Sequence, residues 1–159
     1  MTDSEFTALA RRYMDMIFRI AFGMTKSRAD ADDVTQNVLL ALYRSGREFD
    51  SEQHLKNWLA RCAVNECRKI FRSPFHKAED FDSYSETLIF EEERYSELYA
   101  AIMALERKYR TVVVLHYCEG YSIAEIADIL KIPPGTVGTR LSRAREKLRS
   151  CLSEADKNE

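Results

Sequence analysis

Proline and glycine are scarce in this sequence, which holds three prolines and five glycines in 159 residues. Both residue types interrupt helices, so their scarcity favours a mostly helical chain. The apolar content of 45% is normal for globular proteins, which argues against general disorder. The length suits one domain or two small ones.

Motifs of catalysis and metal binding are missing as well. The sequence has no glycine-rich phosphate loop, no nucleophile elbow and no histidine pair at a metal-binding spacing. Its three histidines, His54, His76 and His116, stand apart, and we interpret each as a surface or packing residue. We therefore expect a protein that is not an enzyme and that holds no cofactor and no metal.

Long apolar runs and zinc-type cysteine spacings are also absent. No run approaches membrane-spanning length, and the polar, acidic N-terminus is unlike a signal peptide, so we expect a cytoplasmic protein without membrane insertion. The four cysteines are scattered, and we expect reduced and mostly buried thiols. A role in redox sensing stays open. These residues are Cys62, Cys67, Cys118 and Cys151.

Charge is nearly balanced overall but unevenly distributed. The formal net charge is −2, which by itself says nothing about nucleic acid. Residues 56–72 carry five basic side chains and one acid, and residues 136–149 carry the same balance. Residues 74–97 between them carry eight acids and two bases. Two local basic patches therefore flank an acidic connector, and such patches set an electrostatic footprint.

Residues 119–149 have the pattern of a helix-turn-helix. Ser122 stands where a helix N-cap belongs, and Glu125 follows at the capping-box spacing. A Lys-Ile-Pro-Pro-Gly run then breaks the first helix, so the second is expected to start near Pro134 or Thr136. Apolar residues recur at helical spacing in both helices. They are Ile123, Ile126, Ala127 and Leu130, then Val137, Leu141, Ala144 and Leu148.

The second of these helices is basic outside its apolar stripe. Hydroxyl and guanidinium groups occupy its other faces, and such groups contact base edges and phosphates in a DNA major groove. An ordinary helical hairpin with a solvated basic face is the alternative. The short loop and the basic second helix agree with each other, so DNA binding is the preferred interpretation.

Hydrophobic periodicity predicts further helices upstream of this motif. The segment of residues 109–117 is ambiguous, because Thr-Val-Val-Val-Leu has strand propensity while Tyr109, Val112, Val113 and Tyr117 fit one helical face. All neighbouring segments are helical, so a helix is preferred there. The other predicted helices cover residues 4–24, 53–72 and 95–105. A further helix is predicted from a cap at Asp30 or Asp32 to about Ser45.

The helix that ends near Ser45 has two distinct faces. We expect Val34, Val38 and Leu42 to be buried. The remaining faces combine acids, amides and one leucine, a mixture that fits either a solvated surface or a partner-binding face. These residues are Asp32, Asp33, Gln36, Asn37 and Leu40.

The helix of residues 53–72 combines an apolar stripe with a basic remainder. Asn65 is unusual, because an asparagine amide competes with the backbone in a helix interior. The same amide can donate to and accept from a base edge, although a tolerated surface asparagine is the alternative. We assign Trp58 to the core rather than to a base-stacking surface. The stripe consists of Leu55, Trp58, Leu59, Cys62, Ala63 and Ile70.

Helical periodicity is lost between Ser73 and about Glu93. We interpret this acidic stretch as a flexible linker that contains the domain boundary. Its acids keep the segment soluble and extended, or shield the basic patches from DNA. The sequence thus predicts an all-α protein of two small helical domains. Their bounds are 1–73 for the first domain, 74–94 for the linker and 95–153 for the helix-turn-helix domain, before a frayed tail.

Several stretches of the chain resemble known motifs of one family. The chain resembles an extracytoplasmic-function (ECF) RNA polymerase sigma factor of the sigma-70 family. Residues 30–38 resemble the family's core-polymerase-binding helix, and residues 55–65 resemble the segment before and within its promoter-melting helix. Residues 121–127, 135–141 and 143–148 resemble the region that reads the upstream promoter element.

The resemblance implies a two-domain helical protein that joins core RNA polymerase and directs it to chosen promoters. Asp32, Asp33 and Gln36 would lie on the face that meets the polymerase clamp. Such sigma factors are commonly held inactive by an anti-sigma factor, so the resemblance also implies that partner.

The resemblance further implies two sets of residues that contact promoter DNA. One set would hold the melted downstream element and its phosphates, and it comprises Arg61, Asn65, Arg68 and Lys69. Stacking and edge contacts must offset the stacking energy that is lost when a base is extruded from the duplex. The other set would face the upstream duplex, with its first member near a phosphate at the helix start; it comprises Thr136, Thr139, Arg140 and Arg143.

Gly138 departs from the family's pattern, because family members often carry a DNA-contacting basic residue there. The upstream sequence preference is therefore not carried over. Two other functions stay open: a conventional helix-turn-helix regulator with a dimerisation or sensing domain, and a protein-interaction adaptor with acidic partners. The second basic patch with Asn65 argues against the regulator, and salt-dependent DNA binding with polymerase would exclude the adaptor.

Overall fold

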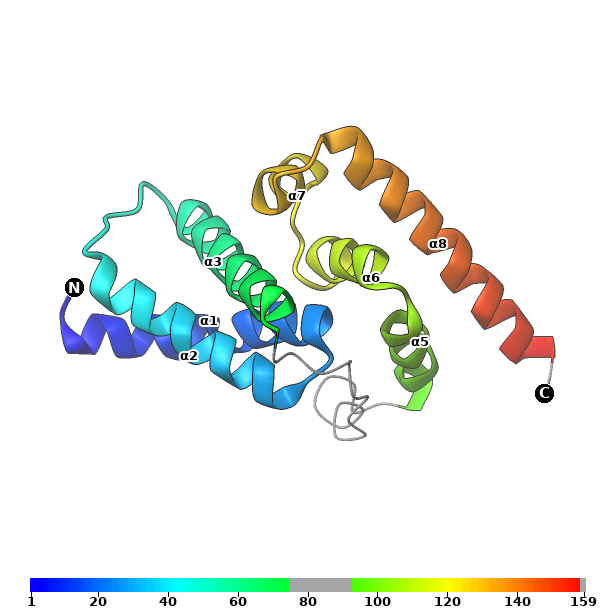
Figure 1. Cartoon of the computed structure of the whole chain (residues 1–159), viewed down its shortest axis with the longest axis horizontal. Helices are drawn as coiled ribbons and strands as arrows, with labels where there is room; N and C mark the ends of the chain where they lie inside the picture. The colour runs from blue at the N-terminus through cyan, green and yellow to red at the C-terminus, as the bar shows by residue number, and fades with distance from the viewer. Residues whose placement is uncertain (75–92, 158–159) are drawn as a thin grey trace. The chain divides into compact units, whose positions relative to one another are not determined.

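Every regular element in the described part of the chain is a helix, which confirms the predicted all-α fold. This computed structural model describes residues 1–74 and 93–157, and of residues 93–95 and 154–157 the backbone alone. The chain divides into two compact units, Met1–Asp80 and Phe81–Glu159, whose helices are labelled in Figure 1. Most of the predicted acidic linker, residues 75–92, lies outside the described residues.

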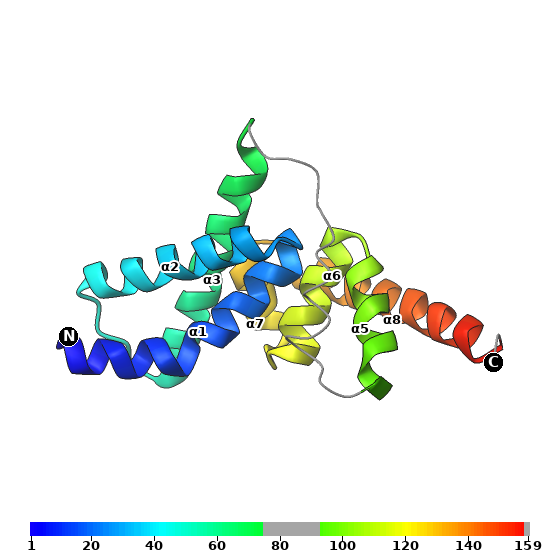
Figure 2. The ribbon, with the colours of Figure 1, turned by 90° about the horizontal axis from the view of Figure 1, so that it is seen from below.

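Over residues 1–74 the N-terminal unit consists of three helices, and each of them contacts the other two. Figure 1 and Figure 2 show α1 and α2 side by side, with α3 crossing them. Ile17 of α1, Val34 of α2 and Leu59 of α3 are among the fully buried side chains at this crossing. The helices are α1 Asp3–Thr25, α2 Arg28–Ser45 and α3 Glu52–Arg72.

Side-chain caps fix where these helices begin. Thr2 and Glu5 form a capping box at the start of α1. The sequence-based choice of Asp30 or Asp32 as the cap of α2 is wrong, because Ser27 Oγ accepts the Asp30 backbone N–H at 3.2 Å. Asp30 instead lies in the first turn, where a negative charge favours the positive end of the helix.

The buried face of α3 differs from its predicted apolar stripe. Because α3 packs against both α1 and α2, its buried face is wider than one stripe and also takes in Ala60, Val64 and Cys67. Three predicted core residues, Trp58, Cys62 and Ile70, are only half-buried at its edge. The other three, Leu55, Leu59 and Ala63, are buried as predicted.

In residues 93–157 the C-terminal unit has five helical segments, of which α8 contacts α5, α6 and α7. A core cluster of Ile102, Leu105, Tyr109, Val113 and Ala144 joins α5 and α6 to α8. The segments are α5 Glu93–Ala104, α6 Arg107–Val113, the π-helix η1 Val114–Cys118, α7 Ile123–Leu130 and α8 Pro134–Lys157. The last helix thus continues beyond residue 153, where the sequence predicts a frayed tail.

A π-helical turn interrupts the helix predicted for residues 109–117. The Glu119 backbone N–H donates to the Val114 carbonyl at 3.0 Å, which is an i→i+5 bond. The wider turn changes the angular position of the residues in it, so that Tyr117 does not share the buried face of Tyr109. Tyr117 is 53% exposed, and its hydroxyl accepts a 2.8 Å hydrogen bond from Arg145.

The helix-turn-helix forms where the sequence predicts it. Ser122 and Glu125 make the predicted capping box. Lys131 ends α7 in the left-handed region with φ 57°, and α8 then begins at Pro134. The predicted apolar residues of both helices are buried or half-buried, with the exception of Ile123, which is 39% exposed at the first position of α7.

The cysteines are less buried than the sequence suggests. Cys67 is buried and Cys62 is half-buried, but Cys118 and Cys151 are exposed, so the expectation of mostly buried thiols is wrong. Cys118 falls in the π-helical turn, and Cys151 lies beyond the apolar stripe of α8. In the described ranges, no helix is both long and apolar enough to cross a membrane.

Candidate nucleic-acid interface

One face of α2 presents the residues assigned to polymerase binding. Asp32, Asp33 and Gln36 are all exposed. The opposite face is anchored, because Val34, Val38 and Leu42 are buried as predicted. Two large apolar side chains on the same helix are also exposed, Leu40 at 47% and Tyr43 at 49%. The helix therefore offers a mixed acidic, polar and apolar surface.

An open groove of about 410 Å³ lies between α2 and α3. It brings together three of the four residues assigned to downstream DNA, namely Asn65, Arg68 and Lys69, while Arg61 is not among its lining residues. We call this groove the α2–α3 groove. Its remaining lining residues are Asn37, Val38 and Ala41 from α2, and Cys62, Glu66 and Arg72 from α3.

A carboxylate ties the two walls of the α2–α3 groove together. Glu66 accepts a hydrogen bond from Asn37 Nδ2 at 3.3 Å and pairs with Lys69 Nζ at 3.1 Å. Asn65 beside it is exposed. Burial, assisted by the negative charge of Glu66, raises the pKa of the Cys62 thiol, which keeps it protonated at neutral pH. The groove therefore presents an amide among fixed polar groups.

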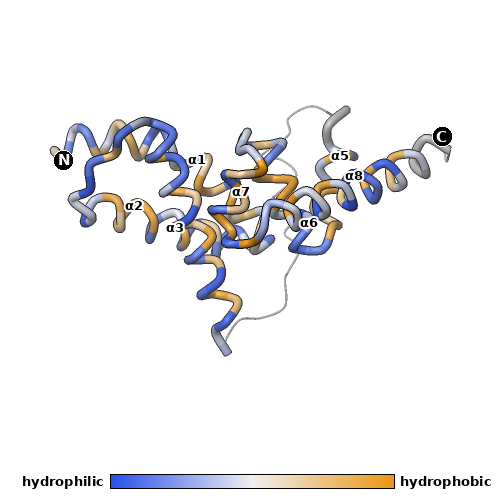
Figure 3. The backbone as a smooth tube through the Cα atoms, turned by 90° about the horizontal axis from the view of Figure 1, so that it is seen from above, coloured by the Kyte–Doolittle hydropathy of each residue, from blue (hydrophilic) through white to orange (hydrophobic). Residues whose placement is uncertain are grey.

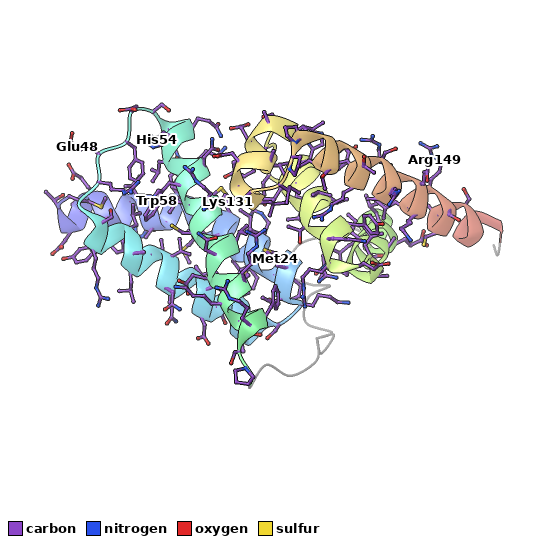
Figure 4. The ribbon with its side chains drawn as sticks, turned by 45° about the horizontal axis from the view of Figure 1, so that its top comes forward. Met24, Glu48, His54, Trp58, Lys131 and Arg149 are labelled. Carbon is purple, nitrogen blue, oxygen red and sulfur yellow. The ribbon has the colours of Figure 1, made fainter. Side chains whose placement is uncertain are left out.

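A cluster of rings and one guanidinium surrounds Trp58, which the sequence had assigned to the core. Phe49 meets the Trp58 ring edge-to-face at 5.6 Å and the His54 ring at 5.2 Å. Arg47 lies over the same indole at 6.0 Å. Figure 4 shows His54 and Trp58 beside the loop that joins α2 to α3. Half-buried rings of this kind offer stacking surfaces that periodicity alone does not predict.

A second groove, of about 350 Å³, lies between α6 and α8. It brings together all four residues assigned to the upstream duplex. Two residues from α6 complete it, Lys108 and Tyr109, which the sequence analysis had not linked to DNA. We call it the α6–α8 groove. Its lining residues are Lys108, Tyr109, Gly135, Thr136, Thr139, Arg140 and Arg143.

Cations extend along α8 on the side of this groove. Thr136, Arg140, Arg143 and Lys147 recur at spacings of four, three and four, which lines them up on one helical face. Figure 3 shows hydrophilic and hydrophobic residues alternating along this helix. Lys147 Nζ lies 5.4 Å from the centre of the Tyr109 ring, and Lys108 Nζ lies 5.1 Å from the same point. The buried tyrosine thus connects cations of two helices.

Gly138 leaves open space on α8. A Cβ atom built on this residue would meet no heavy atom within 4 Å. Its backbone is helical and outside the left-handed region, so neither packing nor conformation requires glycine here. As for metals, no group of three or more His, Cys, Asp or Glu residues in the described part of the chain could hold an ion.

Two sequence families match this chain, and both are regions of sigma-70. Residues 9–74 match the family described as Sigma-70 region 2, and residues 95–148 match Sigma-70, region 4. The chain is 31% identical over 167 residues to the ECF RNA polymerase sigma factor SigW of Bacillus subtilis, covering 94% of this chain and 89% of SigW. This chain belongs to the ECF RNA polymerase sigma factors. It therefore acts in transcription initiation as an RNA polymerase sigma factor.

Further comparisons agree with this family. The ECF sigma-E factor of Haemophilus influenzae is 32% identical over 165 residues, covering 90% of this sigma factor and 85% of the relative. Sigma factor RpoE from Bartonella quintana, solved with the anti-sigma factor NepR, has a similar fold, with a TM-score of 0.72, 21% identity and coverage of 94% and 97%. CnrH, solved with the cytosolic domain of CnrY, has a TM-score of 0.69, 24% identity and coverage of 96% and 90%.

Proposed function

We propose that this sigma factor divides promoter recognition between its two units. The C-terminal unit reads the upstream element as a duplex, and the N-terminal unit melts the downstream element. The observation that carries the proposal is the pair of grooves, since each gathers residues assigned to one DNA element within one unit. The two grooves also differ in chemistry in the way that the two tasks require.

The α6–α8 groove suits duplex DNA. Thr139 and Arg143 are exposed on the second helix of the helix-turn-helix, the helix that enters a major groove in this motif. Arginine pairs with guanine edges or with phosphates, and threonine hydroxyls contact either. Thr136 in the first turn of α8 is suited to a phosphate. Together these residues account for both positioning and base contacts.

The α2–α3 groove suits an unpaired strand. Extruding a base costs a few kcal/mol of stacking, which contacts to the free base must offset. Asn65 supplies a donor and an acceptor for a base edge, and Arg68 and Lys69 supply charge for the strand's phosphates. The half-buried rings of Phe49 and Trp58 add stacking surface on the same unit.

Two protein partners complete the proposal. Core RNA polymerase binds the exposed face of α2, where Asp32, Asp33 and Gln36 lie on the same helix as the exposed Leu40. An anti-sigma factor is the second partner. It is suggested by the family and by the solved complex of RpoE with the anti-sigma factor NepR. We infer no catalytic role, because a sigma factor is a DNA-binding subunit.

In vitro transcription tests this function. Core RNA polymerase and a library of genomic fragments are incubated with and without this protein, and new transcript starts are mapped. We expect starts that depend on the protein and share paired upstream and downstream elements. No dependent start, combined with a footprint on duplex DNA in the absence of polymerase, would instead favour a conventional helix-turn-helix regulator.

A further inference from the structure

We propose that Lys108, which lies outside the helix-turn-helix, makes a phosphate contact with the upstream duplex. The contact extends the DNA-binding surface from α8 to α6 and is independent of base sequence. The inference rests on the proposed function of the C-terminal unit, because it adds a residue to the same upstream site.

The position of Lys108 carries this inference. Its side chain is exposed and lines the α6–α8 groove together with Arg140 and Arg143. Among the described residues that line this groove there are three cations and no carboxylate. An anionic ligand that reaches the two arginines therefore also meets the lysine.

Tyr109 restrains the neighbouring cations. Its ring is buried, and the ammonium groups of Lys108 and Lys147 lie 5.1 Å and 5.4 Å from its centre. A cation over an aromatic face is held by the ring's quadrupole. Because Lys147 follows Arg140 and Arg143 on one face of α8, the ring links Lys108 to the row of cations that the duplex would follow.

The chemistry of lysine indicates a phosphate rather than a base. Its ammonium is a compact charge without the planar fork that lets arginine recognise guanine. Lys108 also lies on α6, whereas the helix that enters the major groove is α8. Backbone contacts of this kind add affinity and fix orientation without reading sequence.

The test measures salt dependence with the complete protein. Holoenzyme is assembled from core RNA polymerase and the full chain, and it is bound to a promoter fragment found by the transcription assay. The same fragment with a scrambled upstream element is the second probe. Affinities are measured between about 50 and 200 mM salt, a range over which phosphate contacts dominate the change. Thermal melting of each variant checks that it is folded.

We expect Lys108→Gln to make the slope of log affinity against log salt shallower by about 0.9, the value for one lost phosphate contact. The loss should be equal on both probes. Arg11→Gln removes one charge from an exposed side chain of α1, outside both basic patches, and it should leave the slope unchanged. Arg143→Gln should weaken binding more on the intact element than on the scrambled one.

Three results would overturn the inference. If Lys108→Gln keeps the wild-type slope while Arg143→Gln weakens binding, the lysine contact is wrong and the proposed upstream reading stands. If Lys108→Gln weakens capture of an acidic protein partner but not of DNA, the groove serves that partner instead. If the protein supports no transcription from any fragment, the proposed function fails and this inference fails with it.

Discussion

The two basic patches of this sigma factor carry the same charge balance in the sequence but present it differently in the structure. Residues 56–72 and 136–149 each have five basic residues and one acid. In the α2–α3 groove the acid, Glu66, lies among the bases and pairs with Lys69. The α6–α8 groove has no carboxylate among its described lining residues. Helix packing, and not the count of charges, thus decides how each patch presents its positive charge.

The chemistry of the α2–α3 groove and that of the α6–α8 groove favour different tasks. A groove with fixed donors and acceptors can hold one base in one orientation, whereas a groove of cations and hydroxyls follows a backbone. If the two units fold and bind independently, a substitution in one unit should leave the stability and the DNA contacts of the other unchanged. The following predictions test that separation.

Truncation of a core leucine should have the largest effect. Leu141 is 1% exposed, and Leu141→Ala should destabilise the C-terminal unit by roughly 2–5 kcal/mol through lost burial and a cavity. The chain has a single tryptophan, Trp58, which lies in the N-terminal unit. Thermal unfolding followed by far-UV ellipticity should therefore show an early transition that Trp58 fluorescence does not.

Leu59→Ala is the matched control, since Leu59 is equally buried in the N-terminal unit. It should lower the transition seen by Trp58 fluorescence and leave the unfolding of the C-terminal unit unchanged. If either variant shifts both transitions together, the two units are energetically coupled and cannot be treated as separate surfaces.

A glycine on α8 should give a smaller effect of opposite sign. Gly138→Ala should stabilise the C-terminal unit by about 1 kcal/mol, because alanine is the better helix former and its Cβ meets no atom within 4 Å. Gly120→Ala is the contrasting variant and should destabilise the same unit, because Gly120 has φ 77°, a backbone conformation that is strained for alanine. Thermal melting of the C-terminal unit measures both, and a loss of stability in Gly138→Ala would contradict the first.

The smallest effect at neutral pH should come from Tyr13 in the N-terminal unit. Burial, together with the 2.7 Å hydrogen bond that its hydroxyl donates to Glu52, raises the pKa of Tyr13 to about 12. The folded state therefore retains this proton better than the unfolded state, whose tyrosines titrate near pH 10. The stability contributed by this group is fully present below pH 10 and is lost as pH rises toward 12.

Tyr13→Phe should remove this part of the pH dependence. Between pH 10 and 12 the variant should lose less stability than the wild type, measured by denaturant unfolding of the N-terminal unit at several pH values. The other tyrosines titrate in both proteins, so the difference between the two curves isolates Tyr13. Identical slopes would show that the hydroxyl titrates as it does in the unfolded chain.

Helix positions could be predicted from the sequence because hydrophobic periodicity and capping residues are local signals. Ser122, Glu125 and Pro134 define the helix-turn-helix in the sequence and in the structure alike. The burial of Trp58 could not be predicted, because it depends on the angle at which α3 crosses α1 and α2. Tyr117 was missed for a different reason, since the π-helical turn breaks the regular spacing on which the prediction relied.

The candidate sites were predictable only in part. The side chains on α8 belong to a motif and share one helical face, so their assembly followed from spacing. Lys108 precedes the nearest of them by almost thirty residues, and only the packing of α6 against α8 brings it to the same groove. Glu66 was visible as a single acid, but its bond to Asn37 requires α2 and α3 to be in contact.

The most direct test of the division between the two units compares two variants on one promoter. Holoenzymes with Asn65→Ala and with Arg143→Ala are examined by footprinting of the upstream element and by permanganate reactivity of unpaired thymines downstream. Asn65→Ala should keep the upstream footprint but lose permanganate reactivity, and Arg143→Ala should weaken the upstream footprint itself. An Asn65→Ala holoenzyme that melts the downstream element as the wild type does would contradict the division.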